Sequence, residues 1–232
     1  MQEIKNNIIA ISRDINDICI KKGKAPDNIT IIAVTKTIDP SRVNYAIKCG
    51  IRNIGENKVQ EIMAKYENIE ESVNWHLIGH LQTNKVKYII DKVALIHSVD
   101  SIGLAEEINK RAEKAGLVKD VLVQVNVAQE ETKFGIEYDE TESFAERLSG
   151  LSSIRVKGLM TIAPYYDDAE LARPVFRRLK EKFDMLAAAS IPNVDMKYLS
   201  MGMTNDYKVA IEEGSNMVRI GTGIFGARNY DL

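Results

Sequence analysis

Short runs of consecutive hydrophobic residues alternate along the chain with longer segments in which every third or fourth residue is hydrophobic. The short runs are rich in β-branched residues and predict buried strands, whereas the longer segments predict helices that bury one face. The first helix is predicted over residues 2–22, where isoleucines recur at alternating spacings of four and three residues. Eight strands are predicted, at residues 29–35, 51–55, 75–79, 93–99, 121–127, 154–162, 196–201 and 217–221.

The helical segments carry residues that commonly mark helix ends. Asp39 is the predicted N-cap of a helix with Pro40 in its first position, and Gly50 follows the end of that helix. Gly116 and Gly150 follow two later helical segments in the same way, and Gly23 follows the first. These signals support a regular alternation of strands and helices.

Alternating strands and helices predict a parallel sheet. Eight such units in a chain of this length are typical of a closed (β/α)8 barrel, the TIM barrel, here with an extra helix at residues 1–23 before the first strand. A doubly wound open sheet is the alternative, because periodicity does not reveal whether a sheet closes. No Pro- or Gly-rich linker divides the chain, so we predict a single domain over residues 1–232.

Composition and charge exclude several classes of partner. The 31 Lys and Arg residues nearly balance 33 Asp and Glu residues and are scattered, so neither nucleic acid nor an anionic membrane is an expected partner. No apolar stretch approaches the roughly 18 residues of a membrane span, and the N-terminal segment lacks the features of a signal peptide, so we expect a cytoplasmic protein. The two cysteines, Cys19 and Cys49, are expected to be core residues of helices rather than part of a disulfide or metal site.

The candidate chemistry begins with Lys36, a charged residue that directly follows the hydrophobic run 29–35. A lysine buried without a partner is costly, so its amine either reaches water at the strand end or has a chemical role. In a TIM barrel the C-terminal ends of the strands form the active site, and the loops after the seventh and eighth strands often bind phosphate. Lys36 is predicted to lie at that end of the first strand.

The loops after the seventh and eighth predicted strands are suited to binding an anion. They read SMGMTND (200–206) and GTGIFG (221–226), and both combine glycine with hydroxyl groups, so their backbone N–H groups can converge on a phosphate. GTGIFG also fits the G-x-G-x-x-G dinucleotide fingerprint. That fold needs a further helix, a strand and an acidic residue about 20 positions later, and only six residues follow Gly226. A dinucleotide fold is therefore not expected.

Arg219 lies inside the otherwise hydrophobic strand 217–221, where a guanidinium needs an acceptor. That acceptor is either a structural carboxylate or a ligand at the barrel mouth. Among the histidines, His76 and His80 would lie roughly 13 Å apart on an extended chain at about 3.3 Å per residue, so no shared metal ion is expected. His97 is expected to be a hydrogen-bonded core residue, whereas His80 and Asn84 can reach the barrel mouth or face solvent.

A lysine amine, two anion-binding loops and a buried arginine together suit a phosphorylated carbonyl compound. Pyridoxal 5′-phosphate (PLP) and sugar phosphates both qualify, because a neutral lysine amine can form a Schiff base with either. With PLP, Lys36 would take the aldehyde, the two loops the phosphate and Arg219 the pyridine nitrogen.

Several motifs, in this order, resemble those of the pyridoxal phosphate homeostasis proteins, which are relatives of the alanine racemase barrel. They are AVTKT (33–37), NIGENKVQE (53–61), WHLIGHLQTNK (75–85), GLMTIAP (158–164), LSMGMTND (199–206) and VRIGTGIFGAR (218–228). The resemblance implies that Lys36 is the Schiff-base lysine, that Arg219 faces the pyridine nitrogen and that Asn57 lines the cofactor. It also implies that the phosphate is held by Ser200, Met201, Gly221 and Thr222.

Two positions depart from the family pattern. Ile38 stands where many members have a second lysine, which puts any cofactor-transfer role of that position in doubt. Gly223 stands where they usually have alanine, a change that should leave backbone contacts to phosphate intact. Lys133 matches the loop lysine that relatives place near the barrel mouth.

The resemblance implies a PLP-binding protein with no established turnover reaction, which buffers the cofactor or delivers it to PLP-dependent apoenzymes. We expect it to be a monomer. An alanine racemase also needs a β-rich second domain, and arginine at the ring nitrogen weakens the pyridine as an electron sink, so catalysis is not expected. A low-efficiency amino-acid racemase, a lysine aldolase of sugar phosphates and a structural role without ligand are the alternatives.

Overall fold

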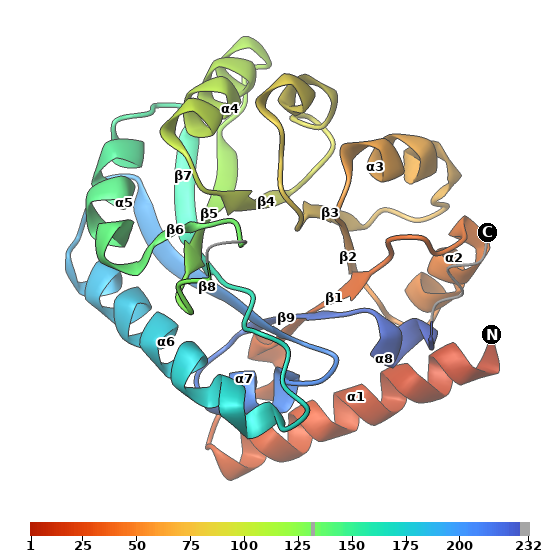
Figure 1. Cartoon of the computed structure of the whole chain (residues 1–232). Coiled ribbons are helices and arrows are strands. Elements are labelled where there is room, and N and C mark those ends of the chain that lie inside the picture. The colour runs from red at the N-terminus through yellow and green to blue at the C-terminus, as the bar shows by residue number, and fades with distance from the viewer. Residues whose placement is uncertain (131–132, 228–232) are drawn as a thin grey trace.

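The central sheet closes into a ring. The computed structural model describes residues 1–130 and 133–227, and its parallel strands pair in the cyclic order β1, β2, β3, β4, β5, β7, β8, β9 and back to β1 (Figure 1). These strands are β1 (Thr30–Val34), β2 (Asn53–Glu56), β3 (Asn74–Leu77), β4 (Leu95–Val99), β5 (Lys119–Asn126), β7 (Ile154–Met160), β8 (Val194–Met203) and β9 (Met217–Ile220). The fold is therefore the predicted TIM barrel and not a doubly wound open sheet, because the β4–β5 and β9–β1 pairings leave no free edge in the ring.

A two-residue strand, β6 (Ile136–Glu137), was not predicted. It pairs in parallel with β5 and lies outside the ring. Two residues are too few to show a hydrophobic alternation, so the sequence gives no signal for it. Gly135, just before β6, has a φ of 124°, and a Cβ atom there would lie 2.8 Å from the Asn126 nitrogen. Glycine is therefore required where this segment approaches the end of β5.

The strand β8 extends beyond its predicted end. It continues to Met203 because its pairings with β7 and β9 shift register along its length. Gly158 of β7, with a φ of 144°, permits one of these shifts, since a Cβ atom there would lie 1.8 Å from the Tyr198 carbonyl oxygen. Gly202 and Met203 consequently also lie within the strand, and the loop after β8 is shorter than the sequence indicated.

Helices surround the ring (Figure 1). The α-helices are α1 (Gln2–Lys21), α2 (Pro40–Lys48), α3 (Val59–Lys65), α4 (Ile102–Lys114), α5 (Thr141–Ser149), α6 (Arg173–Ala188), α7 (Tyr207–Glu212) and α8 (Thr222–Phe225). The 3₁₀ helices are η1 (Pro26–Asn28), η2 (Tyr66–Asn68), η3 (Thr83–Tyr88), η4 (Tyr138–Glu140) and η5 (Ala169–Ala172). The predicted extra N-terminal helix is present as α1, whereas the connection from β3 to β4 contains only the 3₁₀ helix η3.

Most of the predicted helix ends have the expected geometry. The Asp39 carboxylate accepts the Ser41 N–H at 2.8 Å and caps α2, with Pro40 in the first position. Gly23, Gly50 and Gly116 follow α1, α2 and α4 with positive φ angles, the conformation that favours glycine at a helix C-terminus. Gly150 also directly follows its helix, α5, as predicted, but with a φ of −75°, which any residue can adopt.

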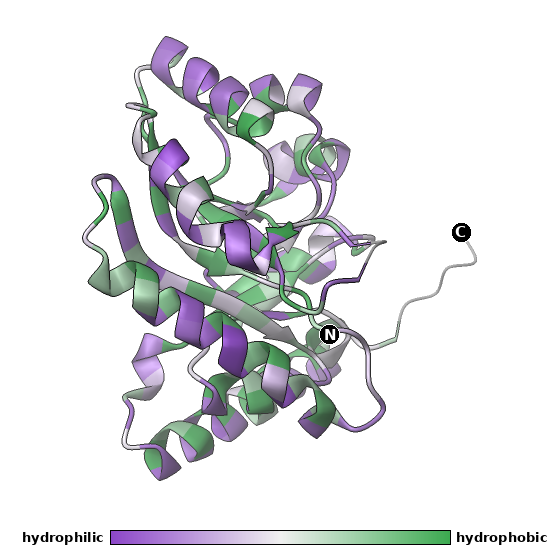
Figure 2. Ribbon diagram, turned by 60° about the vertical axis from the view of Figure 1, so that its left-hand side comes forward, coloured by the Kyte–Doolittle hydropathy of each residue, from purple (hydrophilic) through white to green (hydrophobic). Residues whose placement is uncertain are grey.

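Hydrophobic side chains fill two spaces. The larger one lies between the strands and the helices, and α1 contributes its buried isoleucines to it. Alternate strand positions form a second cluster, inside the ring, of Ile32, Leu95, Leu122, Met160 and Met217. Figure 2 shows hydrophobic and hydrophilic residues alternating along the surrounding helices, as expected for elements with one buried face. Across the described part of the chain, no helix combines the length and apolar character needed to cross a bilayer.

Two isoleucines of α1 provide a matched test of this packing. Ile15 is 4% exposed and Ile9 is 56% exposed. We expect Ile15→Ala to lower the free energy of unfolding by about 2–5 kcal/mol, because it leaves a cavity in the core. Ile9→Ala should change it by no more than about 0.5 kcal/mol. Urea denaturation of the two variants measures the difference, and equal losses would contradict the orientation of α1.

Candidate functional site

The closed ring brings most of the predicted site residues to the C-terminal ends of the strands. Lys36 lies two residues beyond β1, Asn57 directly follows β2, and Gly221 and Thr222 directly follow β9. The loop after β3 packs against Asn57, because a Cβ atom at Gly79 would lie 2.4 Å from the Asn57 carbonyl oxygen. Lys36 and Asn57 are both partly exposed. The same end of the barrel therefore holds residues from the first, second and last strands of the ring.

Lys36 occupies a tight turn. The Thr35 carbonyl oxygen accepts the Ile38 N–H at 3.0 Å, and Thr37, the third residue of the turn, has a φ of 62°. No hydrogen bond or ion pair of the Lys36 amine is found among the described residues. Ile38 is 6% exposed and packs into the main core, so at this position the chain buries an apolar side chain rather than presenting a second amine.

A buried charged cluster adjoins this turn. The Lys65 amine of α3 donates to the Thr35 carbonyl oxygen at 2.7 Å, to Glu56 Oε1 at 2.8 Å and to Glu61 Oε2 at 3.3 Å. Thr35 Oγ1 donates to Glu56 Oε1 at 2.7 Å, and the Thr37 N–H donates to Glu61 Oε2 at 2.7 Å. This cluster was not predicted from the sequence. Its only signal was the motif NIGENKVQE, whose acidic residues carry no indication of their partners.

The two carboxylates of the cluster titrate differently. Burial raises the pKa of Glu56 to about 7, although Lys65 and Thr35 oppose this shift. Burial alone would also raise the pKa of Glu61, but the Thr37 N–H and Lys65 together hold it below its usual value. Glu56 Oε2 is buried and has no hydrogen-bond partner among the described residues. Glu61 is therefore the firmly ionised acceptor of the pair at neutral pH.

Arg219 of β9 is 3% exposed and has only neutral hydrogen-bond partners among the described residues. One terminal nitrogen donates to Ser200 Oγ at 2.7 Å, and the other donates to the Thr161 carbonyl oxygen at 2.8 Å. Burial lowers its pKa to about 10, and nearby Asp206 partly opposes this effect. The guanidinium stays protonated at neutral pH, so the structure buries a positive charge beside the barrel mouth without pairing it directly with a carboxylate.

Behind Arg219 a chain of polar groups crosses the interior of the barrel. His97 Nδ1 lies 3.1 Å from Ser200 Oγ, His97 Nε2 lies 3.0 Å from His76 Nδ1, and His76 Nε2 lies 3.1 Å from Asn53 Oδ1. Burial lowers the pKa of His76 to about 4 and that of His97 well below its usual value. Both imidazoles are therefore neutral. His97 is the buried, hydrogen-bonded histidine that the sequence predicted, whereas the part of His76 in this chain was not foreseen.

The direction of this chain follows from its two ends. Arg219 can only donate, so the Ser200 hydroxyl accepts from it. A hydroxyl can accept twice, so the Asn53 end decides the remaining bonds: because Asn53 Oδ1 takes a hydrogen from His76, each neutral histidine accepts at its Nδ1, and Ser200 donates to His97 Nδ1. His97 then donates from Nε2 to His76 Nδ1, and His76 donates from Nε2 to Asn53. Asn53 Oδ1 accepts at its end, since it also accepts from Asn74 at 3.0 Å. The Ser200 hydroxyl is thus engaged inside the barrel by His97 and Arg219.

The two predicted anion loops contact each other. The Gly223 N–H donates to Thr204 Oγ1 at 3.2 Å, and the Met203 N–H donates to the Asp206 carboxylate at 2.6 Å. A Cβ atom at Gly223 would lie 2.9 Å from a methyl carbon of Ile220 and 3.1 Å from one of Thr204. The loops after β8 and β9 are therefore in direct contact, through the Gly223 N–H and the Thr204 hydroxyl.

Comparisons with known proteins agree with this arrangement. Residues 18–229 match the family described as alanine racemase, N-terminal domain. The chain is 46% identical over 213 residues to the pyridoxal phosphate homeostasis protein of Aquifex aeolicus, covering 91% of this chain and 92% of that protein. It is 35% identical over 241 residues to the protein of the same name from Escherichia coli K12, covering 99% of each. The chain belongs to the pyridoxal phosphate homeostasis protein family.

Solved structures agree with the family and with the fold. A structure of PipY from Synechococcus elongatus PCC7942 with PLP bound has a TM-score of 0.83 and 29% identity, covering 96% of this chain and all of PipY. A structure of an unknown protein from Bifidobacterium adolescentis has a TM-score of 0.92 and 36% identity, covering 97% and 95% of the two chains. An alanine racemase of Clostridium difficile, at 17% identity and a TM-score of 0.76, shares the fold.

In this member of the homeostasis protein family, the loop after β5 also reaches the barrel mouth. His80, after β3, stacks on Phe134 with ring centroids 4.0 Å apart and lies 3.6 Å from Asp100. Lys133 pairs with Glu130 at 2.5 Å and, with Phe134, lines a hollow of about 150 Å³ beside the end of β5. Asn84, the other candidate for this rim, lies exposed in η3.

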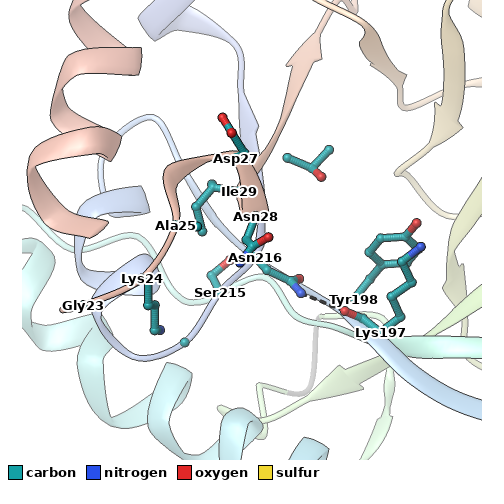
Figure 3. A pocket seen from close by; sticks show the side chains of 12 residues that line it. Gly23, Lys24, Ala25, Asp27, Asn28, Ile29, Lys197, Tyr198, Ser215 and Asn216 are labelled. Carbon is teal, nitrogen blue, oxygen red and sulfur yellow. Dashed lines mark hydrogen bonds between the residues drawn. The ribbon is translucent and has the colours of Figure 1, made fainter. Parts of the chain in front are cut away.

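A hollow unrelated to the predicted site lies at the opposite end of the barrel. It measures about 740 Å³ and is bordered by the segment after α1 and by the starts of β8 and β9, with Lys24, Lys197 and Tyr198 among its lining residues (Figure 3). None of the predicted cofactor-binding residues lines it. No group of three potential metal ligands occurs in the part of the chain that the structure describes. The chemistry is therefore concentrated at the C-terminal ends of the strands.

The neutral state of His76 predicts a pH dependence of stability. Its pKa of about 4 in the folded protein lies below the ordinary value of 6.5, so below pH 6.5 the unfolded chain binds a proton that the folded protein does not. We expect the free energy of unfolding to fall by about 3 kcal/mol on this account as the pH decreases from 6.5 to 4. Urea denaturation at several pH values measures the fall. In His76→Met the slope should be smaller, and an unchanged slope would contradict the assignment.

Proposed function

We propose that this chain binds PLP at the C-terminal end of its barrel and holds it as a Schiff base on Lys36. The observation that carries the proposal is the position of Lys36: its amine lies at the end of β1, partly exposed, with no hydrogen-bond partner among the described residues. An uncommitted amine at this end of a barrel is available to an aldehyde. The names of the homologous proteins and the PLP-bound structure of PipY support the choice of ligand.

The remaining donors at this end suit the other parts of PLP. Arg219 carries a buried positive charge that only neutral groups contact, and we assign it to the pyridine nitrogen. Gly221 and Thr222, beside Thr204, offer backbone N–H and hydroxyl donors to the phosphate, and Asn57 is placed to line the cofactor. Because the Ser200 hydroxyl is engaged by His97 and Arg219, we assign phosphate contacts of Ser200 and Met201 to their backbone only.

The same residues favour retention of the cofactor over catalysis. When bound, PLP supplies an electrophilic aldehyde and a conjugated ring that can accept electrons. Arg219, with a pKa of about 10, holds its proton and would donate a hydrogen bond to the ring nitrogen without protonating it. We therefore propose a non-catalytic role in PLP homeostasis, in which the protein buffers the cofactor or delivers it to PLP-dependent apoenzymes.

The cellular setting is part of the same proposal. We propose that the protein acts in the cytoplasm as a monomer and that one domain over residues 1–232 carries the site. Neither a second subunit nor a second domain is needed to complete the set of donors named above, since β1, β2, β8 and β9 supply them all.

A Lys36→Ala variant tests the covalent role. Purified wild-type protein mixed with PLP and reduced with borohydride should carry a pyridoxyl group on the peptide that contains Lys36, as detected by mass spectrometry. The variant should lose this label and the visible absorbance of the bound cofactor, because the neighbouring Lys65 amine is already bonded to Thr35, Glu56 and Glu61. Lys58→Ala, which removes a nearby exposed lysine, is the control and should keep both. Labelling that is independent of Lys36 would refute the proposal.

Proton exchange separates a carrier from a racemase. We expect the PLP-loaded protein to exchange the α-protons of single amino-acid enantiomers in deuterium oxide no faster than free PLP does. NMR spectroscopy follows the exchange over time. Exchange well above that of the free cofactor, lost in Lys36→Ala, would instead identify a low-efficiency PLP-dependent racemase.

A further inference from the structure

The turn that contains Lys36 is held in an unfavourable backbone conformation. Thr37 has a φ of 62°, in the left-handed region that is rarely adopted by β-branched residues. Turns that need a positive φ at this position usually have glycine or asparagine there. Such conformations persist only where surrounding contacts enforce them, and they are most common at functional sites. The contacts that enforce this one are therefore candidates for a functional role.

Those contacts are hydrogen bonds from residues of β2 and α3 to the residues on both sides of Lys36. Glu61 accepts the Thr37 N–H at 2.7 Å on one side. On the other side, the Lys65 amine donates to the Thr35 carbonyl oxygen at 2.7 Å, and Glu56 accepts from Thr35 Oγ1 at 2.7 Å. Lys65 also donates hydrogen bonds to both carboxylates and so links the contacts on the two sides of Lys36. These contacts hold the backbone on both sides of Lys36, while its amine has no partner within residues 1–130 and 133–227.

Stability alone is a poor explanation for this cluster. Glu56 is fully buried, Lys65 is 8% exposed, and Glu56 Oε2 has no hydrogen-bond partner among the described residues. Buried ion pairs are often no more stabilising than hydrophobic residues of similar volume, because charges lose their hydration. The strained turn and the buried ion pair that holds it are each unfavourable for the stability of the fold. What the arrangement provides is a defined backbone position for Lys36.

We propose that Glu61, oriented by Lys65 and Glu56, is a positioning residue for Lys36: it enforces the left-handed conformation of Thr37 and thereby sets where the amine meets an aldehyde. This inference rests on the proposed function of Lys36 and adds the residues that prepare it. Glu61 and Lys65 do not touch the aldehyde. They act through the backbone of Thr35 and Thr37, and small displacements of a reacting group are enough to slow its reaction.

A cycle of two substitutions tests the proposal. Glu61→Ala removes the acceptor, and Thr37→Gly removes the need for it, because glycine adopts a positive φ without strain. We expect Glu61→Ala to lower PLP affinity at least about tenfold, and Thr37→Gly to restore most of that loss when it is added to Glu61→Ala. Glu61→Gln can still accept the Thr37 N–H and should bind PLP nearly as well as the wild type. Absorbance titration with PLP measures the affinity of the wild type, both single variants of the cycle, the double variant and Glu61→Gln.

The matched control is Glu107→Ala. Glu107 also pairs with a basic residue four positions later, Arg111, but on α4, away from the turn. It should leave PLP affinity unchanged. Urea denaturation of each variant separates a loss of binding from a loss of folding. If the folded Glu61→Ala variant binds PLP normally, or if Thr37→Gly fails to rescue it, Glu61 does not position Lys36.

A second readout keeps this test independent of the proposed function. Acetic anhydride acetylates Lys36 in the protein without PLP, and peptide mass spectrometry measures the rate. This rate depends directly on how the Lys36 amine is placed. The rate should change several-fold in Glu61→Ala and return in the double variant. If the wild type failed to bind PLP while this pattern held, the proposed function would fall and the positioning role would stand. If PLP bound but neither its affinity nor the acetylation rate changed as expected among the variants, the positioning role would be refuted and the proposed function would stand.

Discussion

Closure of the strand ring is the constraint on which the other features of this protein depend. The β9–β1 pairing makes the first and last strands neighbours, so Lys36 after β1 and the loop after β9 lie at one end of the barrel although they are far apart in sequence. Closure also limits the space inside the ring. Most of that space is filled by hydrophobic side chains, and each polar group that enters it needs a partner from another strand.

The partners of the polar groups inside the barrel are neutral. Arg219 is surrounded by a hydroxyl and a carbonyl oxygen rather than a carboxylate, and the hydroxyl is held in turn by two uncharged histidines. Had a carboxylate paired with Arg219 directly, the guanidinium would be neutralised before any ligand arrived. The proposed pyridine contact therefore depends on the histidines being too deeply buried to ionise, and on a chain of hydrogen bonds that runs in one direction.

Lys36 is prepared in the opposite way. Charged residues surround its turn, yet they bond the backbone and side chain of its neighbours and leave its own amine uncommitted. The two ends of the proposed cofactor thus meet two kinds of environment. Charged residues hold the backbone around the reactive amine of Lys36, whereas a chain of uncharged hydrogen-bonding groups lies next to the positively charged Arg219. A protein that retains an aldehyde without turning it over needs both a well-placed amine and a ring nitrogen that stays unprotonated.

The sequence by itself determined the strand and helix pattern, most helix ends, and the positions of Lys36 after the first strand and of Arg219 within the last. These features follow from local periodicity and residue type, and eight parallel units in this length favour a barrel. The tertiary structure decided the closure of the ring, the length of β8, the strand β6 and every partner of a buried polar group. Glu56, Glu61 and Lys65 read as ordinary charges of a helix and a strand, and His76 as an isolated histidine. Their roles depend on contacts between residues that only the closed ring brings within hydrogen-bond distance, because no local pattern records which distant side chain a buried polar group will meet.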